Sequence, residues 1–412
     1  MSNLRNDALH IHKMNQGKLS IQSKVPVKNA NDLSLAYSPG VAEPCKEIYD
    51  REEVVYDYTM KGNMVAVVSD GSAVLGLGNI GPKAALPVME GKSVLFKSFA
   101  GVDSFPICLN TNNIDEIVQT VKLMEPTFGG VNLEDIAAPN CFIIEERLKK
   151  ETNIPIFHDD QHGTAIVTAA GLMNALKLVG KSFSEIKVVA NGAGAAGIAI
   201  IKLLHNLGVR EMIMCDSKGA IYQGRTEGMN DVKEQVAKIT NAERKQGSLE
   251  TVLEDADVFI GVSVGNILTE DMVKKMNKDP IIFAMANPEP EIHPDVAKSV
   301  GTKVIGTGRS DFPNQVNNVL AFPGIFRGAL DVQATRINEE MKIAAAEAIA
   351  SLITEEEFHA DYVIPAPFDT RVAPEVAASV ARAAMETGVA RVQVDPDDVK
   401  EKTRQLSQIS TE

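Results

Sequence analysis

The chain has 412 residues, of which 44% are hydrophobic and 23% are charged. This is the composition of a globular protein, and the length exceeds what one hydrophobic core can organise, so it predicts two domains. The formal net charge of −14 argues against nucleic acid or an anionic membrane surface as a main partner.

The first twenty residues contain no apolar core of the signal-peptide kind. The longest apolar region, residues 165–179, is interrupted by polar side chains and predicts no membrane span. The four cysteines are far apart and form no Cys-x-x-Cys pair, which is typical of reduced thiols. We therefore expect a cytoplasmic protein without disulfides or structural zinc.

Short apolar segments in the first 160 residues predict strands. They are MVAVVSD, SVLFKSF, FPICLN, GGVNLED and IPIFHDD. Helical spacing runs from Ile114 to Met124 and stops before Pro126. A longer helix is expected from Thr164 to Gly180, and it should lead into a second domain.

From Ile186 onward, apolar strands alternate regularly with helices, which predicts a parallel sheet covered on both faces. Two later helices carry apolar stripes, expected to form core or subunit contacts: Ile337, Met341, Ala345, Ile349, Leu352 on one, and Val376, Val380, Ala383 on the other. The polar tail after Val394 is expected to fray. The predicted α/β fold thus has an N-terminal substrate and metal domain (1–160), a Rossmann-type coenzyme domain (161–390) and a polar tail (391–412).

Two segments contain Gly-x-Gly-x-x-Gly, the pattern that lets a backbone approach a dinucleotide pyrophosphate. The second directly follows an apolar strand, opens a helix, and precedes an acid, Asp216, at the end of the next strand. These features predict the coenzyme loop, formed by Gly192, Ala193, Gly194, Ala195, Ala196 and Gly197.

The first copy, in VLGLGNIG (residues 74–81), is followed by Pro82 and lacks an acid at a following strand end. We expect a tight turn with close backbone packing whose amides help to line the substrate cleft, and no coenzyme there.

Acidic residues end two predicted strands, with Glu134 and Asp135 after one and Asp159 and Asp160 after the other. A helix cap would account for Asp160 alone. Four neighbouring acids would repel one another without a cation, and carboxylate ligands favour Mg²⁺ or Mn²⁺ over zinc. His158 and His162 leave a zinc alternative open.

Four further residues lie in suggestive places. Lys92 begins a predicted apolar strand, and Tyr37 lies in a Pro/Gly-rich loop. Asn287 ends the fourth strand of the parallel sheet, and Asn318 precedes a predicted helix. Asparagines at the carboxyl edge of such a sheet can bind a carboxylate or carboxamide without adding charge.

Together, the segments AYSPGVAEPC, GGVNLEDIAAPNCF, FHDDQHGTA, VVANGAGAAG, ANPEPEI and DFPNQVNNVLAFPG resemble malic enzyme of the short bacterial type. The resemblance runs from about residue 10 to residue 390. It implies oxidative decarboxylation of L-malate to pyruvate and CO₂, with reduction of NAD⁺ or NADP⁺ and a divalent metal.

By the same resemblance, Glu134, Asp135 and Asp160 match the family's metal ligands. Lys92 matches its general base, Asp159 the acid paired with that lysine, and Tyr37 its general acid. The matches at Asn287 and Asn318 imply contacts with substrate or nicotinamide.

One departure concerns the substrate. Larger relatives carry an arginine that helps to hold the substrate carboxylate, and Ala73 stands in its place here. Arg309 or the amides of the first glycine loop are the alternatives. By the general rule Asp216 repels a 2′-phosphate and favours NAD, but Lys218 could neutralise that phosphate, so we expect dual or NADP-leaning coenzyme use.

The apolar stripes predict a homodimer or a higher homo-oligomer, and the sequence leaves open whether Tyr37 serves its own subunit or a neighbour. The alternatives to a malic enzyme are an amino-acid dehydrogenase and a non-catalytic nucleotide sensor.

Overall fold

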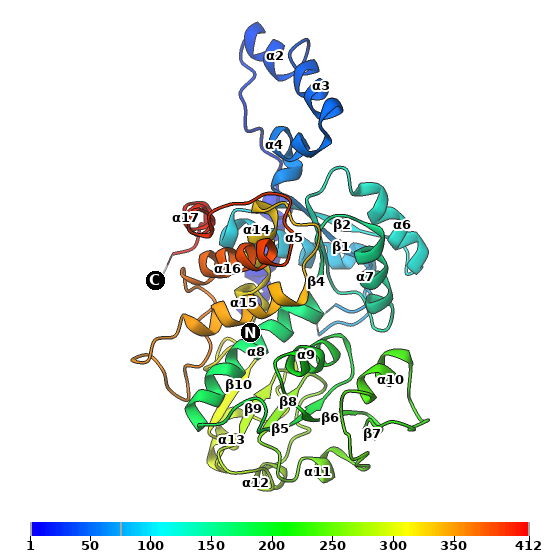
Figure 1. Cartoon of the computed structure of the whole chain (residues 1–412), viewed down its shortest axis with the longest axis vertical. Helices are drawn as coiled ribbons and strands as arrows, with labels where there is room; N and C mark the ends of the chain where they lie inside the picture. Colours follow the sequence, from blue (N-terminus) through cyan, green and yellow to red (C-terminus); the bar gives the residue numbers. More distant parts are fainter. Residues whose placement is uncertain (1, 75, 411–412) are drawn as a thin grey trace.

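The computed structural model describes residues 2–74 and 76–410. It contains two β-sheets joined by one long helix, α8 (Asp159–Val179), which lies between them in Figure 1. The α/β class expected from the sequence is confirmed. Within these described ranges, no helix combines the length and the apolar character needed to cross a membrane.

The N-terminal segment is helical but has little core of its own. It contains α1 (Ser2–Asn15), α2 (Ala30–Ala36), α3 (Ala42–Asp50), η1 (Glu52–Val54), α4 (Val55–Tyr58) and η2 (Met60–Gly62). Helices α2 and α3 bury no residue, and Figure 1 shows them projecting away from both sheets. We call residues 29–50 the arm.

The first sheet has four parallel strands in the order β2-β1-β3-β4. Its strands are β1 (Met64–Ser69), β2 (Asp103–Cys108), β3 (Gly130–Leu133) and β4 (Ile156–His158), connected by α5 (Gly81–Ala100), α6 (Ile114–Met124) and α7 (Asn140–Glu151). Leu133 of β3 lies opposite His158 of β4. The residues that follow these two strands therefore emerge at the same edge.

The segment predicted as a strand at residues 93–99 is instead the second half of α5, so that prediction was wrong. Pro82 is tolerated in the first turn, and Gly101 ends the helix in the left-handed conformation with a φ of 62°. The buried side chains recur at helical spacing: Ala85, Met89, Ser93, Phe96, Phe99 and Ala100. A dense apolar run does not by itself distinguish a buried helix from a strand.

The second sheet has six strands in the order β10-β9-β8-β5-β6-β7, all parallel except β7. The strands are β5 (Lys187–Asn191), β6 (Glu211–Asp216), β7 (Gly219–Ala220), β8 (Val258–Gly261), β9 (Ile281–Ala284) and β10 (Val304–Thr307). The accompanying helices are α9 (Ala195–Asn206), α10 (Asp231–Ala237), α11 (Leu249–Val252), α12 (Glu270–Lys274) and α13 (Pro294–Ser299). The strand order reverses between β5 and β8, where ligands of doubly wound sheets bind.

The C-terminal elements return to the first sheet. They are η3 (Asn318–Leu320), α14 (Phe322–Asp331), α15 (Glu339–Ser351), α16 (Val372–Glu386) and α17 (Pro396–Leu406), and α14 and α16 pack beside α5 (Figure 1). The rings of Phe322 and Phe326 lie 4.7 and 5.3 Å from that of Phe96 in edge-on contacts. The stripes on α15 and α16 are largely buried within this chain as core.

The expectation that the tail after Val394 frays was wrong. Asp395 caps α17 by accepting a hydrogen bond from the Asp397 amide, and Val399 is buried. Beyond the helix, the amide of Gln408 donates to the carbonyl of Ser98 at 2.7 Å. The few apolar residues of this polar segment find partners only because the fold brings α5 and α16 beside them.

Candidate active site

Three carboxylates meet where β3 and β4 end. Glu134 and Asp135 follow β3, and Asp160 lies in the first turn of α8, which begins five residues earlier than the expected Thr164. One oxygen from each of the three side chains lies within 4.8 Å of the others. We call Glu134, Asp135 and Asp160 the carboxylate trio.

Burial and mutual repulsion make the trio costly to ionise. Burial raises the pKa of Glu134 well above its usual range, and burial with the nearby charge of Asp160 raises that of Asp135 to about 7. Asp135 also has a left-handed φ of 54°, and its amide donates to Asp160 Oδ2 at 2.8 Å. Such backbone conformations are concentrated at functional sites.

The trio fits a hard divalent cation. Asp135 Oδ2 is buried without a hydrogen-bond partner among the described residues, so an acceptor in the trio is left unused. The three ligand atoms that meet here are carboxylate oxygens, which Mg²⁺ and Mn²⁺ prefer. Neither His158 nor His162 belongs to this group, and His162 instead contacts Glu145 at 2.7 Å. The site therefore favours Mg²⁺ or Mn²⁺ over the zinc alternative.

Lys92 lies on α5 beside the trio, at the centre of the site. Its Nζ is 2.7 Å from Asp159 Oδ2 and 2.9 Å from Glu134 Oε1, and its side chain is 11% exposed. The ammonium also lies 4.4 Å from the centre of the Phe322 ring. Burial lowers the pKa of Lys92, but Asp159 and Glu134 outweigh it and raise the pKa above its ordinary range.

Asn318, the first residue of η3, joins the same cluster. Its Nδ2 donates to Asp159 Oδ2 at 3.0 Å, and its Oδ1 accepts from Thr164 Oγ1 at 3.1 Å. Asp159 is completely buried, so Lys92 and Asn318 together hold one of its oxygens in place. Sequence reasoning gave Thr164 no role in the site, although it lies in the segment FHDDQHGTA.

Tyr37 is not brought to this cluster by its own chain. It follows α2 on the arm, it is 68% exposed, and the arm projects away from both sheets (Figure 1).

The first glycine loop contacts the segment that carries Asp135. The amide of Ala73 donates to the Asp135 carbonyl at 3.0 Å, and Ser72 Oγ accepts from the Ala137 amide. A Cβ on Gly71 would lie 2.4 Å from the Gly81 carbonyl oxygen, so the turn is closely packed. Leu75 of this loop lies outside the described residues.

The second glycine loop connects β5 to α9, as predicted for a dinucleotide fingerprint. Gly192 has a φ of 121°, and a Cβ on Gly197 would lie 1.8 Å from the Gly192 carbonyl oxygen. Helix α9 begins at Ala195 without a side-chain cap, which leaves its first amides available to an anion.

Asp216 ends β6 but is not a free acid. Arg225 binds both of its oxygens, and Lys233 Nζ lies 2.7 Å from Oδ2. Burial opposes ionisation, but these hydrogen bonds prevail and lower the pKa of Asp216 to about 2. The two cations lie 9 and 17 residues further along the chain, where no motif marks them.

The remaining predicted polar residues lie at the edge of the second sheet. Asn287 is exposed after β9, near Gly308. Arg309 forms a bidentate ion pair with Asp311. The guanidinium that was an alternative for binding the substrate carboxylate is therefore already paired.

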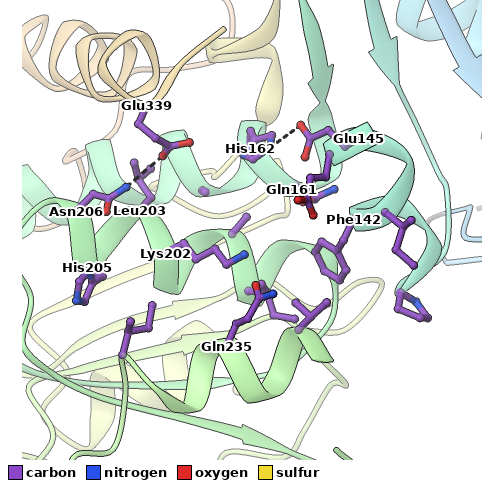
Figure 2. Close-up of a pocket in the computed structure, with 18 of the residues that line it drawn as sticks. Phe142, Glu145, Gln161, His162, Lys202, Leu203, His205, Asn206, Gln235 and Glu339 are labelled. Carbon is purple, nitrogen blue, oxygen red and sulfur yellow. Dashed lines mark hydrogen bonds and ion pairs between the residues drawn. The ribbon is translucent and has the colours of Figure 1, made fainter. Parts of the chain in front are cut away.

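A separate groove of about 870 Å³ runs along α9 between α7 and α10 (Figure 2). Glu145 and His162 form one contact across it, and Asn206 and Glu339 another. Its lining contains neither Lys92 nor any member of the trio, so the volume of this groove does not locate the chemistry.

The sequence matches two models of one protein family. The model described as malic enzyme, NAD binding domain, matches residues 161–385, and the malic enzyme N-terminal domain matches residues 16–113 and 110–149. The chain belongs to the malic enzyme family. This confirms the expected NAD(P)-dependent oxidoreductase that decarboxylates malate, and disfavours the amino-acid dehydrogenase alternative.

Individual relatives agree with this membership. The chain is 78% identical over 404 residues to the bifunctional malic/malolactic enzyme of Bacillus subtilis, with 98% of each chain covered. It is 58% identical to the NAD-dependent malic enzyme of Geobacillus stearothermophilus, covering 91% of this chain and 78% of that one. The crystal structure of malic enzyme from Pyrococcus horikoshii has a TM-score of 0.94 at 48% identity, covering 98% and 95% of the two chains.

Another relative is longer. The NADP-dependent malic enzyme of Escherichia coli is 51% identical over 96% of this chain, which spans 54% of that protein. Malic enzyme relatives named for NAD and for NADP are therefore both similar to this chain.

Proposed function

We propose that this malic enzyme oxidises L-malate at Lys92, with the carboxylate trio holding Mg²⁺ or Mn²⁺ and the second sheet binding NAD⁺ or NADP⁺. The observation that carries the proposal is the contact of Lys92 with both Asp159 and Glu134, beside the trio. A four-carbon hydroxy acid bound there can meet a base and a nicotinamide at once.

The chain's own groups account for the proton movements. Lys92 takes the proton of the C2 hydroxyl while hydride leaves C2 for the nicotinamide, and Asp159 with Asn318 holds the amine in place. The C3–C4 bond then breaks with loss of CO₂, and a proton delivered to C3 by Tyr37 completes pyruvate. A divalent cation on the trio would supply Lewis-acid stabilisation of negative charge on the C2 oxygen.

The direct test follows NAD(P)H absorbance with L-malate and Mn²⁺. We expect reduction of the nucleotide with stoichiometric pyruvate. Absence of signal with both nucleotides would overturn the proposed function and favour the nucleotide-sensor alternative.

We also propose a cytoplasmic location, because the four cysteines are free thiols, which persist in a reducing compartment.

We further propose that Tyr37 acts in the site of a second copy. The arm buries none of its helical residues, and large apolar side chains along it are exposed: Leu33, Leu35, Tyr37, Val41 and Tyr49. Such a surface is typical of a segment that packs against another protein, and a two-fold dimer exchanges both arms. This supports the expected homodimer.

Complementation tests the exchange. Tyr37→Phe and Lys92→Ala should each be nearly inactive alone, because each lacks one proton-transfer group. After unfolding and refolding as an equal mixture, half of the dimers are mixed and each has one complete site, so about a quarter of wild-type activity returns. If Tyr37 acts within its own chain, no activity returns.

The environment of Asp216 supports use of NADP⁺ as well as NAD⁺. A free acid at this position repels a 2′-phosphate, but here Arg225 and Lys233 offset its charge. Lys233→Gln should raise the KM for NADP⁺ about tenfold and that for NAD⁺ less than about threefold, since only the former carries the extra phosphate. The control is Lys238→Gln, at an exposed position close by in the sequence, which should leave both KM values unchanged. Equal changes for both coenzymes would contradict this assignment.

A second activity is favoured by the Bacillus subtilis relative, whose name includes malolactic enzyme. If NADH stays bound after CO₂ leaves, its hydride can return to C2 of pyruvate and give lactate, with no net change in coenzyme. Lactate formed from malate at catalytic NAD⁺ would support this, and lactate at background level would reject it.

A further inference from the structure

Glu291 is a completely buried carboxylate outside the catalytic cluster. It lies four residues after Asn287, in the segment that connects β9 to α13. Among the described residues, Glu291 forms no ion pair with a lysine, arginine or histidine, which is unusual for a buried acid.

Its two oxygens join two different loops. Oε1 accepts from the amide of Ser263 at 3.1 Å, and Oε2 accepts from the amide of Ala286 at 3.0 Å. Ser263 follows β8, whereas Ala286 follows β9 and immediately precedes Asn287. One carboxylate therefore sets the spacing of two loops at the carboxyl edge of adjacent strands.

The link continues to the coenzyme loop. Asn191, the last residue of β5, donates from Nδ2 to Ser263 Oγ at 2.7 Å, and Gly192 packs directly on the Val262 carbonyl. The loops that follow β5, β8 and β9, which are adjacent strands of the second sheet, are thus connected through the backbone and the side chain of Ser263. In doubly wound sheets a dinucleotide binds in the crevice at this edge, so these loops would line it.

Glu291 is itself held firmly. Its main-chain carbonyl accepts from the Leu268 amide at 2.9 Å, and a Cβ on Gly261 would lie 2.3 Å from its carboxyl carbon. Burial raises the pKa of Glu291, while hydrogen bonds from the amides of Ala286 and Ser263 oppose the rise. The carboxyl group is therefore packed against Gly261 while it binds the two amides.

We propose that Glu291 is a positioning residue for hydride transfer: by binding the amides of Ser263 and Ala286, it fixes the β8 loop and Asn287 against the nicotinamide end of the coenzyme. This inference rests on the proposed function. Asp216 and the first amides of α9, expected to bind the adenosine and the pyrophosphate, make no contact with Glu291, so the main effect is on orientation rather than on coenzyme affinity.

Glu291→Gln is the sharpest test, because the amide keeps the size but turns one acceptor into a donor that faces an N–H group. We expect kcat to fall about 10- to 100-fold, as for small misplacements of reacting groups. The Kd for NADPH, from its fluorescence, should change less than about threefold. The primary isotope effect with 2-deuterated malate should increase, because hydride transfer becomes more rate-limiting. Glu289→Gln, exposed two residues away, is the matched control.

A purely structural role predicts a different pattern, in which thermal stability falls but each folded molecule retains wild-type kcat and isotope effect. That result would overturn the proposal. If Glu291→Gln does not fold, Glu291→Asp serves instead: it keeps the charge but is too short to reach both amides, and the same fall in kcat is expected. Wild-type kcat in Glu291→Asp would overturn the proposal. Failure of the wild-type protein to oxidise malate would reject the proposed function instead.

Discussion

Lys92→Ala should lower kcat for malate oxidation by about 10²- to 10⁴-fold, the usual contribution of a general base. Lys92 is positioned for this role by Asp159 at 2.7 Å and Glu134 at 2.9 Å. Binding of NADPH should be retained, because the coenzyme loop lies on the other sheet. Steady-state kinetics and a fluorescence titration of NADPH measure the two effects separately.

Lys92→Arg separates proton transfer from charge. Arginine keeps a cation beside Asp159 but cannot release its proton near neutral pH, so a loss similar to that of alanine is expected. Lys97→Ala, an exposed position on the same helix, is the control for α5. Substantial activity in Lys92→Arg would show that Lys92 supplies charge and not a base.

The pH profile gives an independent check of this role. Asp159 and Glu134 raise the pKa of Lys92, so the neutral amine is scarce near neutral pH unless the carboxylates are occupied by a cation. The kcat/KM of the wild-type enzyme should therefore rise with pH. The Lys92→Ala variant should lose this rise.

Asp160→Asn should lower activity by about 10³-fold and weaken Mn²⁺ binding, because it removes one of three carboxylate ligands. Losing metal stabilisation of a developing negative charge is worth several kcal/mol, and each 1.4 kcal/mol is about tenfold in rate. Free Mn²⁺ measured by electron paramagnetic resonance reports binding without requiring turnover. The exposed Asp115→Asn is the control, and Mn²⁺ binding unchanged in Asp160→Asn would contradict the site.

The same trio predicts a pH-dependent effect of metal on stability. The pKa of Asp135 is raised from 3.8 to about 7, so its ionisation costs stability as pH rises through that interval. A bound dication removes the cost and also stabilises the folded state by mass action. Mn²⁺ should therefore raise Tm more at pH 8 than at pH 5, and EDTA should reverse the gain.

Sequence patterns predicted the structure most reliably where the local residues permit only one backbone conformation. The strand, glycine turn and helix around Gly192–Gly197 form as predicted, because only glycine tolerates the φ of Gly192 and the close approach of Gly197 to the Gly192 carbonyl. The helix at Ile114–Met124 has its predicted bounds. The pairing of Glu134 and Asp135 with Asp160 follows from parallel strands ending at one edge.

Local patterns were less informative where several folds bury the same side chains. The apolar run at residues 93–99 suited a strand or a buried helix equally, and only packing against Phe322 and Phe326 decided for α5. The polar tail became helix α17 because neighbours distant in sequence supplied apolar partners. In both cases the deciding contacts are non-local.

By itself, the sequence determined the family, the α/β class, the coenzyme loop and the chemical character of the candidate site, because these depend on residue type and short spacing. The resemblance had already implied that Asp159 pairs with Lys92, and the structure shows this contact with Lys92 on a helix rather than a strand. Only the tertiary structure decided that Asp216 pairs with Arg225 and Lys233, and that the arm carrying Tyr37 lies away from the cluster. Long-range packing controls these distances, and residue spacing along the chain does not encode them.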